Sequence, residues 1–553
     1  MKTDIEIAQE TKLEHIKNIA RKINIDEEDL EYYGKYKAKL SSTLWDKIKN
    51  NKDGKLILVT ATNPTKFGEG KTTVSIGLAD AFNKLNHKAI VALREPSMGP
   101  VFGQKGSAGG AGFSQVVPME DIALHFTGDI HAVTAAHNLL TAMLDNHIHQ
   151  GNKLQIDLRK IVWKHVLDIS DRSLRNIIVS LGGRSNGIVR ESGFDIAVAS
   201  EITAILCLAK NLSDLKNRLS KIIVAYDINN QPITAEDLKA TGSLTLLLKD
   251  ALKPNLVQTL EHNPAIIHGF PFANIAQGVN SIQATKYALK LADYVVTEAG
   301  FGSDLGGEKF LNIKCRLNNI TPNCVVIVTT LRSLKLHGGL DKNNLNQINI
   351  EAIQKGLSNL EKHIENMQNF NVPVVVALNK FNTDTIEEIN LIKELCINKN
   401  VGFAISEGYL QGGKGVINLA NEVIKYIDNK KINFTYNDKD TIEEKIYKIA
   451  TKIYGANEVN YSKLAKKQLK EFEQYNNLPI CMAKTQYSLS DDSSLLGRPE
   501  NFSITVKELK VNAGAEFIVT LLGDILTMPG LPKVPAAENI DINTETGQII
   551  GLF

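Results

Sequence analysis

The stretch TATNPTKFGEGKTT, residues 60–73, holds the residue types that bind the phosphates of a nucleotide. Lys71 has the reach to contact the outer phosphates, and the hydroxyl of Thr72 or Thr73 can bind Mg²⁺. The first glycine of the usual phosphate-loop pattern would fall at Thr65. The stretch predicts a nucleotide site, with an ordinary glycine-rich turn as the alternative.

The segments on either side are those that a phosphate loop needs. Residues 55–62, KLILVTAT, are an apolar run typical of a strand buried on both faces of a parallel sheet. Gly68 and Gly70 then let the backbone approach an anion. Apolar residues at helical spacing follow and predict an amphipathic helix whose first N–H groups face the loop: Val74, Leu78, Ala81, Phe82 and Leu85. We therefore expect ATP or phosphate to contact Thr65, Lys66, Phe67, Gly68, Glu69, Gly70, Lys71, Thr72 and Thr73.

A second candidate anion site follows the next apolar run. Residues 94–113, REPSMGPVFGQKGSAGGAGF, are too rich in glycine for a stable helix or strand, so a flexible linker is one alternative. Polar residues are interleaved with the glycines, which favours an anion-binding loop: Arg94, Glu95, Gln104 and Lys105. The fork of Arg94 suits a pair of carboxylate or phosphate oxygens, although a surface ion pair with Glu95 or Glu120 would also explain it.

A third group, TEAGFGSDLGGEKF at residues 297–310, combines acidic residues with an aromatic one. Glu298, Asp304 and Glu308 could hold Mg²⁺ or orient a basic group. Phe301 could present a flat face to a ligand, or it could be an ordinary core residue. The histidines at 125, 131 and 137 would lie on different faces of a helix, which argues against a metal site.

The segment VVVALNKFNTD, residues 374–384, resembles the N-K-x-D sequence with which GTPases recognise guanine. Asn382 stands in place of the aspartate of that sequence. Guanine specificity is therefore disfavoured, and we expect the nucleotide to be an adenine nucleotide.

The elements that must position these residues are short apolar runs separated by helical stretches. Eight such runs predict strands, at residues 56–62, 89–96, 176–183, 222–227, 294–300, 325–331, 372–378 and 401–406. Strands that alternate with helices indicate an α/β fold with a parallel sheet. Because such sheets bind ligands at the carboxyl ends of their strands, we expect the site at that edge.

Composition sets the broad class of the protein. A chain of 553 residues is too long for one core, so we expect two to four domains. The net charge of +2 argues against a nucleic-acid binder, and the lack of a long apolar run argues against a membrane protein. The first residues show no signal peptide, which favours the cytoplasm. Five scattered cysteines indicate buried thiols rather than disulfides or a zinc site.

Several separate segments, in order, resemble the monofunctional bacterial formate–tetrahydrofolate ligases. The most specific are GQKGSAGGAGF (103–113) and VTTLRSLKLHGG (328–339), each close to a signature of that family. PMEDIALHFTGDIHA (118–132), EAGFGSDLGGEKF (298–310) and the terminal TMPGLPKVPAAENIDI are also similar. In this family the phosphate loop itself has threonine and proline where the usual first glycine would be.

The resemblance implies an ATP-dependent ligase that joins formate to tetrahydrofolate through formyl phosphate in one-carbon metabolism. It implies Lys71 and Arg94 as catalytic residues, with Arg94, Glu95 and Asp129 around formate and formyl phosphate. ATP and Mg²⁺, the latter near Thr72, are the implied cofactors. A monovalent cation is a further possible cofactor, and the sequence does not show whether the enzyme requires one.

The resemblance also implies the folate side and the larger architecture. Phe301, Phe381 and Tyr409 would contact folate, with Tyr409 where relatives have tryptophan and Asn382 where they have proline. We expect a homotetramer whose subunit has a phosphate-loop NTPase-like parallel sheet core and additional α/β domains. The predicted nucleotide-binding domain spans residues 1–120 plus about 300–375, the second domain about 121–299, and the third, which contributes to the folate site, about 376–553.

Two other classes of protein have part of the same pattern. A switch ATPase of the partitioning type would use a loop lysine ahead of Gly70, and Lys66 is available. A switch ATPase of this type would not explain why residues 328–339 are close to a signature of the ligase family. Nor would it explain the aromatic residues at the positions that the resemblance assigns to folate. A protein that binds these ligands without chemistry is disfavoured by the presence of Lys71, Thr72 and Arg94.

Overall fold

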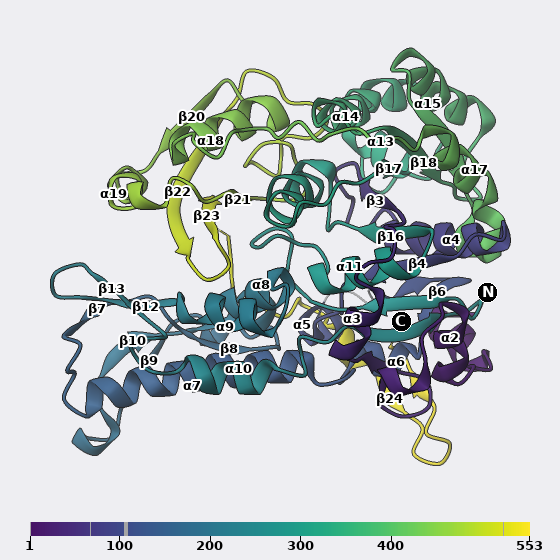
Figure 1. Cartoon of the computed structure of the whole chain (residues 1–553). Helices are drawn as coiled ribbons and strands as arrows, with labels where there is room; N and C mark the ends of the chain where they lie inside the picture. The colour runs from purple at the N-terminus through teal and green to yellow at the C-terminus, as the bar shows by residue number, and fades with distance from the viewer. Residues whose placement is uncertain (1, 67, 104–108, 524, 553) are drawn as a thin grey trace.

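A computed structural model describes residues 2–66, 68–103, 109–523 and 525–552. Its centre is a large sheet in which all neighbouring strands from β15 to β19 are parallel (Figure 1). The strands lie in the order β1 (Leu30–Tyr32), β2 (Ala38–Leu40), β14 (Asn255–Thr259), β15 (Pro264–Ile267), β4 (Ala89–Leu93), β16 (Tyr294–Glu298), β3 (Lys55–Ala61), β17 (Cys324–Thr329), β18 (Val374–Asn379) and β19 (Gly402–Ser406). A short branch, β5 (Gly110–Ala111) and β6 (Ser114–Val117), pairs with β14.

Both faces of this sheet are buried, as the continuous apolar strands predict. On β3, Leu56 and Leu58 pack into one hydrophobic cluster with α11 (Ile282–Leu291) and α14 (Ile350–Asn369). The alternate residues Ile57 and Val59 pack into a second cluster with α4 (Lys71–Lys84) and α17 (Ile417–Tyr426). Because these strands run parallel, their carboxyl ends lie along one edge of the sheet.

The helix that follows the phosphate loop is more deeply buried than its sequence pattern predicts. The spacing of apolar residues predicts one buried face, but every residue from Thr73 to Phe82 on α4 is buried. The segment η7 (Gly412–Val416) and α17 cover the side of α4 that faces away from the sheet. Small residues such as Gly77 allow this close packing, since a Cβ there would lie 2.9 Å from Ser114 and Val416.

Two further regions flank the sheet in Figure 1. One contains α7 (Asp129–His149), α8 (Glu201–Leu208), α9 (Leu212–Ser220) and α10 (Thr241–Leu248) with a sheet of β7 (Ile156–Ile161), β12 (Ile223–Asp227) and β13 (Pro232–Thr234). The other is a four-stranded sheet in the order β20 (Glu458–Tyr461), β22 (Ser503–Asn512), β23 (Phe517–Leu522) and β21 (Ile480–Ala483), with α18 (Ile442–Ile449) and α19 (Lys463–Glu471).

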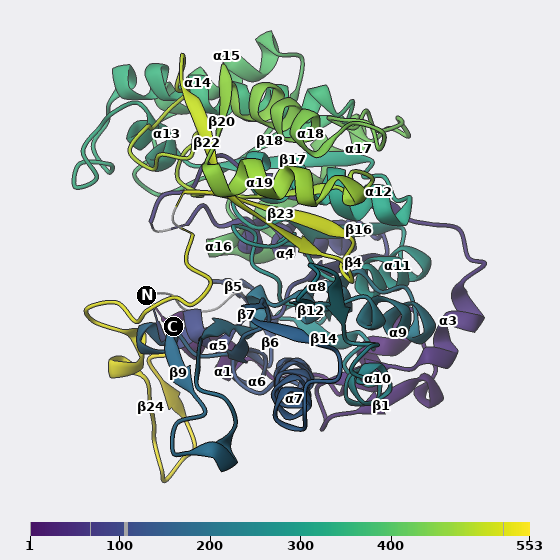
Figure 2. The same ribbon diagram turned by 90° about the vertical axis from the view of Figure 1, so that its left-hand side faces the viewer.

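All eight predicted strands are present, but two of them lie outside the parallel sheet. β12 pairs antiparallel with both of its neighbours. β9 (Ile177–Val179) forms a hairpin with β10 (Arg190–Ser192), which extends away from the main sheet in Figure 2. Only residues 180–189 connect the two strands, which is too short for the crossover helix that a parallel pairing needs.

The main sheet takes strands from all three predicted domains, and the proposed domain boundaries themselves stay a prediction. The burial of all five thiols is confirmed, at Cys207, Cys315, Cys324, Cys396 and Cys481. Among the helices of the described residues, none combines the length and the apolar character needed to span a membrane.

Candidate active site

The carboxyl edge of the main sheet, where its parallel strands end, gathers most of the residues that the sequence predicts for the site. Arg94 and Glu95 follow β4, Phe301 follows β16, the phosphate loop (residues 62–70) follows β3, Phe381 follows β18, and Tyr409 follows β19. Asp129 is the first residue of α7. Phe67, Gln104 and Lys105 lie outside the described residues.

The phosphate loop has the backbone that its glycines predict. Gly68 and Gly70 have φ of 77° and 75°, in the left-handed region that favours glycine. A Cβ on Gly70 would lie 2.3 Å from Nδ2 of Asn379, so a larger residue would not fit. Gly70 precedes the first turn of α4, whose unpaired N–H groups form an anion site.

Hydrogen bonds of Glu69 connect the phosphate loop internally and join it to the ends of two neighbouring strands. Its carboxylate accepts hydrogen bonds from the N–H of Thr65, at 2.7 Å, and from the hydroxyl of Thr330. Its carbonyl accepts one from Nδ2 of Asn379, at 3.1 Å. Burial raises the pKa of Glu69, while Thr330, Thr65 and the nearby Lys71 oppose that rise. Thr65, at the position of the missing glycine, thus belongs to a loop braced by hydrogen bonds.

Thr72 and Arg94 are linked by one buried carboxylate. The hydroxyl of Thr72 donates to Oε2 of Glu298 at 2.9 Å, and Nη2 of Arg94 lies 3.9 Å from the other oxygen, Oε1. Nη1 of Arg94 donates to the carbonyl of Pro271 at 3.1 Å. Arg94 therefore pairs with neither Glu95 nor Glu120, and the surface-pair alternative is wrong.

The surroundings of Arg94 suit an anionic ligand. Its side chain is only 22% exposed, burial lowers its pKa, and its Nε has no hydrogen-bond partner. A Cβ on Gly300 would lie 3.1 Å from Nη1 and Nη2, so glycine there gives the guanidinium its space. A buried cation with an unused donor is ready to bind carboxylate or phosphate oxygens.

Glu95 and Asp129, the other predicted formate residues, differ in how they are bonded. Burial first, and then the charge of Asp129, raise the pKa of Glu95 well above its ordinary value. Oε2 of Glu95 is buried without a hydrogen-bond partner. Asp129 instead pairs with Lys39 at 2.7 Å and accepts from Nδ2 of Asn255 at 2.9 Å. Glu95 thus has an unused oxygen, whereas both oxygens of Asp129 are engaged.

The three predicted folate residues make no ring contact with one another. Phe301 is half-buried with a strained φ of 60°, Phe381 lies under the guanidinium of Arg332 at 4.0 Å, and Tyr409 is 38% exposed. The carbonyl of Tyr409 accepts from the N–H of Phe113 at 2.9 Å. Because three strands separate β16 from β19, their ends are roughly 19 Å apart at about 4.8 Å per strand.

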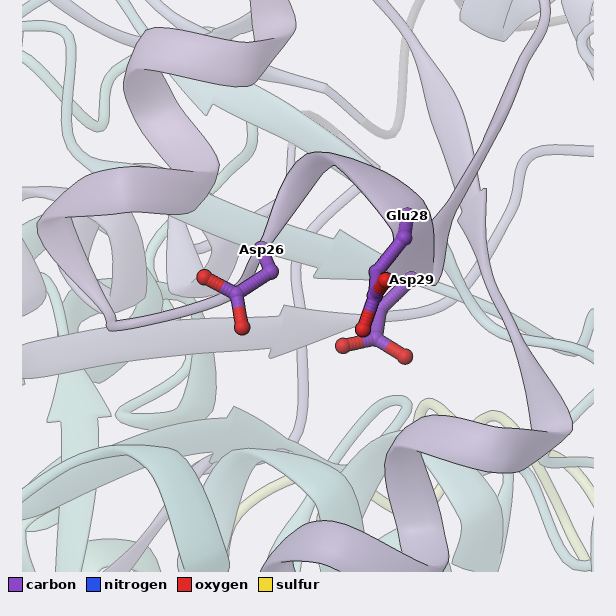
Figure 3. A group of neighbouring side chains, drawn as sticks. All are labelled: Asp26, Glu28 and Asp29. Atoms are coloured by element: carbon purple, nitrogen blue, oxygen red, sulfur yellow. The ribbon is translucent and has the colours of Figure 1, made fainter.

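Two groups of acidic residues lie outside this edge or are used within the fold. Of the three acidic residues in segment 297–310, two are engaged within the fold: Asp304 pairs with Lys484 at 2.8 Å, and Glu308 accepts from Asn312 at 2.6 Å. Only Glu298 of these three faces Thr72 and Arg94. Figure 3 shows a further group near β1, formed by Asp26, Glu28 and Asp29. Lys47 lies 2.5 Å from Glu28 and 2.8 Å from Asp29, so these two carboxylates of the group belong to an ion-pair network.

His137, one of the three histidines whose spacing argued against a metal site, packs against an aromatic residue. Its ring stacks on Trp163 with 4.0 Å between centroids, and Nε2 contacts the carbonyl of Lys164. Burial lowers its pKa to about 3. It is a core histidine.

Sequence reasoning missed the residues that brace the loop. Asn379 matches the asparagine of the N-K-x-D sequence of GTPases, yet here its side chain donates to the carbonyl of Glu69. Thr330 caps α13 (Leu331–His337) and also binds Glu69. Their only signal was that each directly ends or follows a buried parallel strand.

A buried strand, a loop with two left-handed glycines and a helix that begins at Lys71 define a nucleotide-binding α/β protein of the phosphate-loop class. Arg94, a largely buried guanidinium with an unused Nε donor, lies at the same edge. The model of the formate–tetrahydrofolate ligase family matches residues 2–553, nearly the whole chain, so the chain belongs to that family. It is an ATP-dependent carbon–nitrogen ligase that joins formate to tetrahydrofolate in one-carbon metabolism.

Proposed function

We propose that the enzyme activates formate as formyl phosphate beside the phosphate loop and then transfers the formyl group to N10 of tetrahydrofolate. The observation that supports this most is the connection from Thr72 through Glu298 to Arg94. It brings the end of the loop and a buried cation together, so that a phosphate and a carboxylate can meet there.

The first step is transfer of the γ-phosphoryl group. An oxygen of formate forms a bond to the γ-phosphorus as the bond from that phosphorus to ADP breaks. The N–H groups of α4 and the ammonium of Lys71 neutralise the phosphates, while the fork of Arg94 holds formate and then formyl phosphate. The catalytic residues in this proposal are Lys71 and Arg94, and Glu95 and Asp129 are the carboxyl groups of the formate pocket.

The hydroxyl of Thr72 and the carboxylate of Glu298 are oxygen ligands of the kind that Mg²⁺ prefers, and they lie 2.9 Å apart. They fit an ion bound chiefly by nucleotide phosphates. When bound, Mg²⁺ supplies positive charge to the phosphate oxygens. The remaining segment 65–73 contacts the nucleotide through its backbone, with Lys66 exposed to solvent.

The second step is acyl transfer. N10 of tetrahydrofolate attacks the formyl carbon, the bond from that carbon to the phosphate oxygen breaks, and N10 loses a proton. Phosphorylation makes the step possible because phosphate is a far better leaving group than oxide. Phe301, Phe381 and Tyr409 bind the folate rings in this proposal, and a bound folate would have to bridge the spacing between their strands.

Release of ADP tests the reaction as a whole. The enzyme should turn over steadily only with ATP, formate and tetrahydrofolate together, and steady ADP release from ATP alone would contradict the proposal. Formate labelled with ¹⁸O tests the intermediate. If formyl phosphate forms, one labelled oxygen appears in the inorganic phosphate, and unlabelled phosphate would exclude it.

We also propose that the subunits form a homotetramer in the cytoplasm. The hairpin formed by β9 and β10 exposes apolar side chains that self-association would cover: Ile178, Leu181, Ile188 and Val189 are 53%, 65%, 49% and 55% exposed. Light scattering of Ile178→Lys beside the unaltered enzyme tests the assembly. Five unpaired thiols suit a reducing compartment. Assays in potassium and in choline salts test the need for a monovalent cation.

A further inference from the structure

Asn63, the second residue of the phosphate loop, has every polar group engaged although its side chain is wholly buried. Its N–H donates to Nε2 of His363 at 3.1 Å. Its carbonyl accepts from the hydroxyl of Ser333, at 3.1 Å, and contacts Nε2 of His337, at 3.0 Å. Oδ1 accepts from Nδ2 of Asn359 at 2.9 Å.

The amide nitrogen of Asn63 reaches two other parts of the chain. It donates to Oδ1 of Asp304 at 3.3 Å and to the carbonyl of Gln486 at 3.3 Å. Asp304 lies three residues after Phe301 and is held by Lys484 at 2.8 Å, with both side chains buried. Asn63 therefore joins the phosphate loop to α13, to α14, to the segment after β16 and to the C-terminal part of the chain.

A buried hydrogen-bond network of this kind restricts the relative positions of the segments that it joins. Here it fixes the loop that binds phosphate against the segment that carries Phe301. In the two-step reaction, formyl phosphate forms beside the phosphate loop. It must then meet N10 of tetrahydrofolate, which is held near the segment that carries Phe301. A displacement of about 1 Å between reacting groups can cost about 10² in rate.

We propose that Asn63 is a positioning residue that keeps the phosphate loop and the Phe301 segment at the spacing required for formyl transfer. This inference rests on the proposed function, since it uses the roles given there to the two segments. It concerns transfer rather than binding, because Asn63 bonds to the protein through all of its polar groups.

Asn312 provides a matched control. It is also wholly buried, and its amide donates to a carboxylate of the same segment, Oε1 of Glu308, at 2.6 Å. Its other side-chain hydrogen bonds join it to Thr435, at 3.0 and 3.2 Å. Both asparagines thus hold residues 303–308 through a buried amide, but only Asn63 belongs to the phosphate loop.

The test compares Asn63→Ala with Asn312→Ala in the full-length enzyme, at a temperature where circular dichroism shows both variants folded. We expect both variants to lower the melting temperature. Asn63→Ala should reduce kcat for ligation at least 10-fold while the Kd values of ATP and tetrahydrofolate, each measured alone, change less than 3-fold. Asn312→Ala should keep kcat within about 2-fold of the unaltered enzyme.

The ratio of ADP released to 10-formyltetrahydrofolate formed gives a second readout, which loss of stability alone would not change. If transfer is slowed, formyl phosphate reacts with water to give formate and phosphate, and the ratio rises above one. A ratio of one with unaltered kcat in Asn63→Ala, or an equal loss of kcat in Asn312→Ala, would overturn the inference.

Two further variants separate this inference from the proposed function. Lys71→Ala should weaken the ATP step and Phe301→Ala the binding of folate; if neither does, the proposed function fails, whatever Asn63 does. If Asn63→Ala does not fold, Asn359→Ala removes one of the bonds to Asn63, at Oδ1, together with its own bond to the carbonyl of Gly497, and should raise the ratio by a smaller amount. If Asn359→Ala also gives a ratio of one, that result would contradict the positioning role proposed for Asn63.

Discussion

The ATP side and the folate side proposed for the carboxyl edge hold their side chains in opposite ways. On the ATP side, hydrogen bonds or ion pairs fix Glu69, Thr72 and Arg94 before any ligand arrives. On the folate side, Phe301 and Tyr409 come from strands that are not neighbours, and their rings do not touch. The same edge thus combines a preformed polar site with separate aromatic surfaces.

The difference follows from the cost of burying charge. A buried guanidinium or carboxylate without a partner costs several kcal/mol, so the fold supplies partners to most of these charged groups, and Nε of Arg94 and Oε2 of Glu95 are exceptions. An aromatic ring has no such requirement, and its best partner is the flat face of the ligand itself. Charged groups should therefore affect the chemical step most, and rings should affect binding.

Lys71→Ala should produce the largest effect. We expect kcat to fall roughly 10² to 10³-fold or more, because the variant loses a preorganised charge at the phosphates. The melting temperature should change little, since Lys71 begins a helix and is not in the hydrophobic core. Lys84→Ala, which changes the same charge at the other end of α4, is the control and should keep kcat. Turnover of Lys71→Ala at the level of that control would remove the phosphate site proposed here.

Arg94→Lys should come next, with a loss of roughly 10²-fold in kcat/KM for formate. An ammonium group is a point charge and cannot hold two oxygens as the guanidinium does. The measurement is formate KM and kcat in parallel for both proteins. If lysine serves nearly as well, Arg94 contributes charge alone, and the preformed geometry of the ATP side is unimportant.

Tyr409→Ala should weaken the binding of tetrahydrofolate by roughly 1 to 3 kcal/mol through loss of a stacking surface, and should leave the Kd of ATP unchanged. Tyr409→Trp should restore or tighten folate binding. Tyr447→Ala removes another exposed tyrosine, 51% exposed on α18, and should alter neither ligand. An unchanged folate KM in Tyr409→Ala would contradict a folate role for this ring.

The smallest effect concerns acid stability on the ATP side. Burial lowers the pKa of His363 from 6.5 to about 4, so the unfolded chain binds a proton that the folded chain excludes between those values. Stability therefore falls as the pH falls from 6.5 toward 4. Between pH 6.5 and 5 this histidine should account for about 2 kcal/mol, or roughly 2 °C in melting temperature.

Calorimetry at the two pH values, on the unaltered enzyme and on His363→Gln, measures that share. The variant should lose less stability on acidification, because glutamine does not titrate. An identical loss in both proteins would show that other groups account for the acid sensitivity, such as the buried His268, whose pKa is also lowered to about 4.

The sequence predicted what local patterns encode. The strand, loop and helix around Lys71, the parallel sheet and the candidate residues at its edge all follow from periodicity, glycine placement and resemblance. It could not predict that Glu298 would face Thr72 and Arg94, because these residues are far apart in the chain and meet only through the strand order. Nor could it show that Asn379 and Thr330 brace Glu69.

The aromatic side shows a second limit. Resemblance paired Tyr409 with Phe301, but the distance between the two rings depends on how many strands intervene, which no local pattern specifies. Likewise, the amphipathic pattern of α4 did not predict burial on nearly all sides, because the covering segment η7 lies more than 300 residues away in the chain.

The five buried thiols make the protein its own reporter of local opening. Four of them lie in hydrophobic clusters: Cys315 and Cys396 in one, Cys481 in a second, and Cys324 in a third. A thiol reagent can modify each of them only when its cluster opens, and burial further slows the reaction by raising the thiol pKa, to about 12 for Cys324. Labelling rates of the individual thiols, followed by mass spectrometry with and without ATP, would thus measure which hydrophobic clusters open less often when ATP is bound.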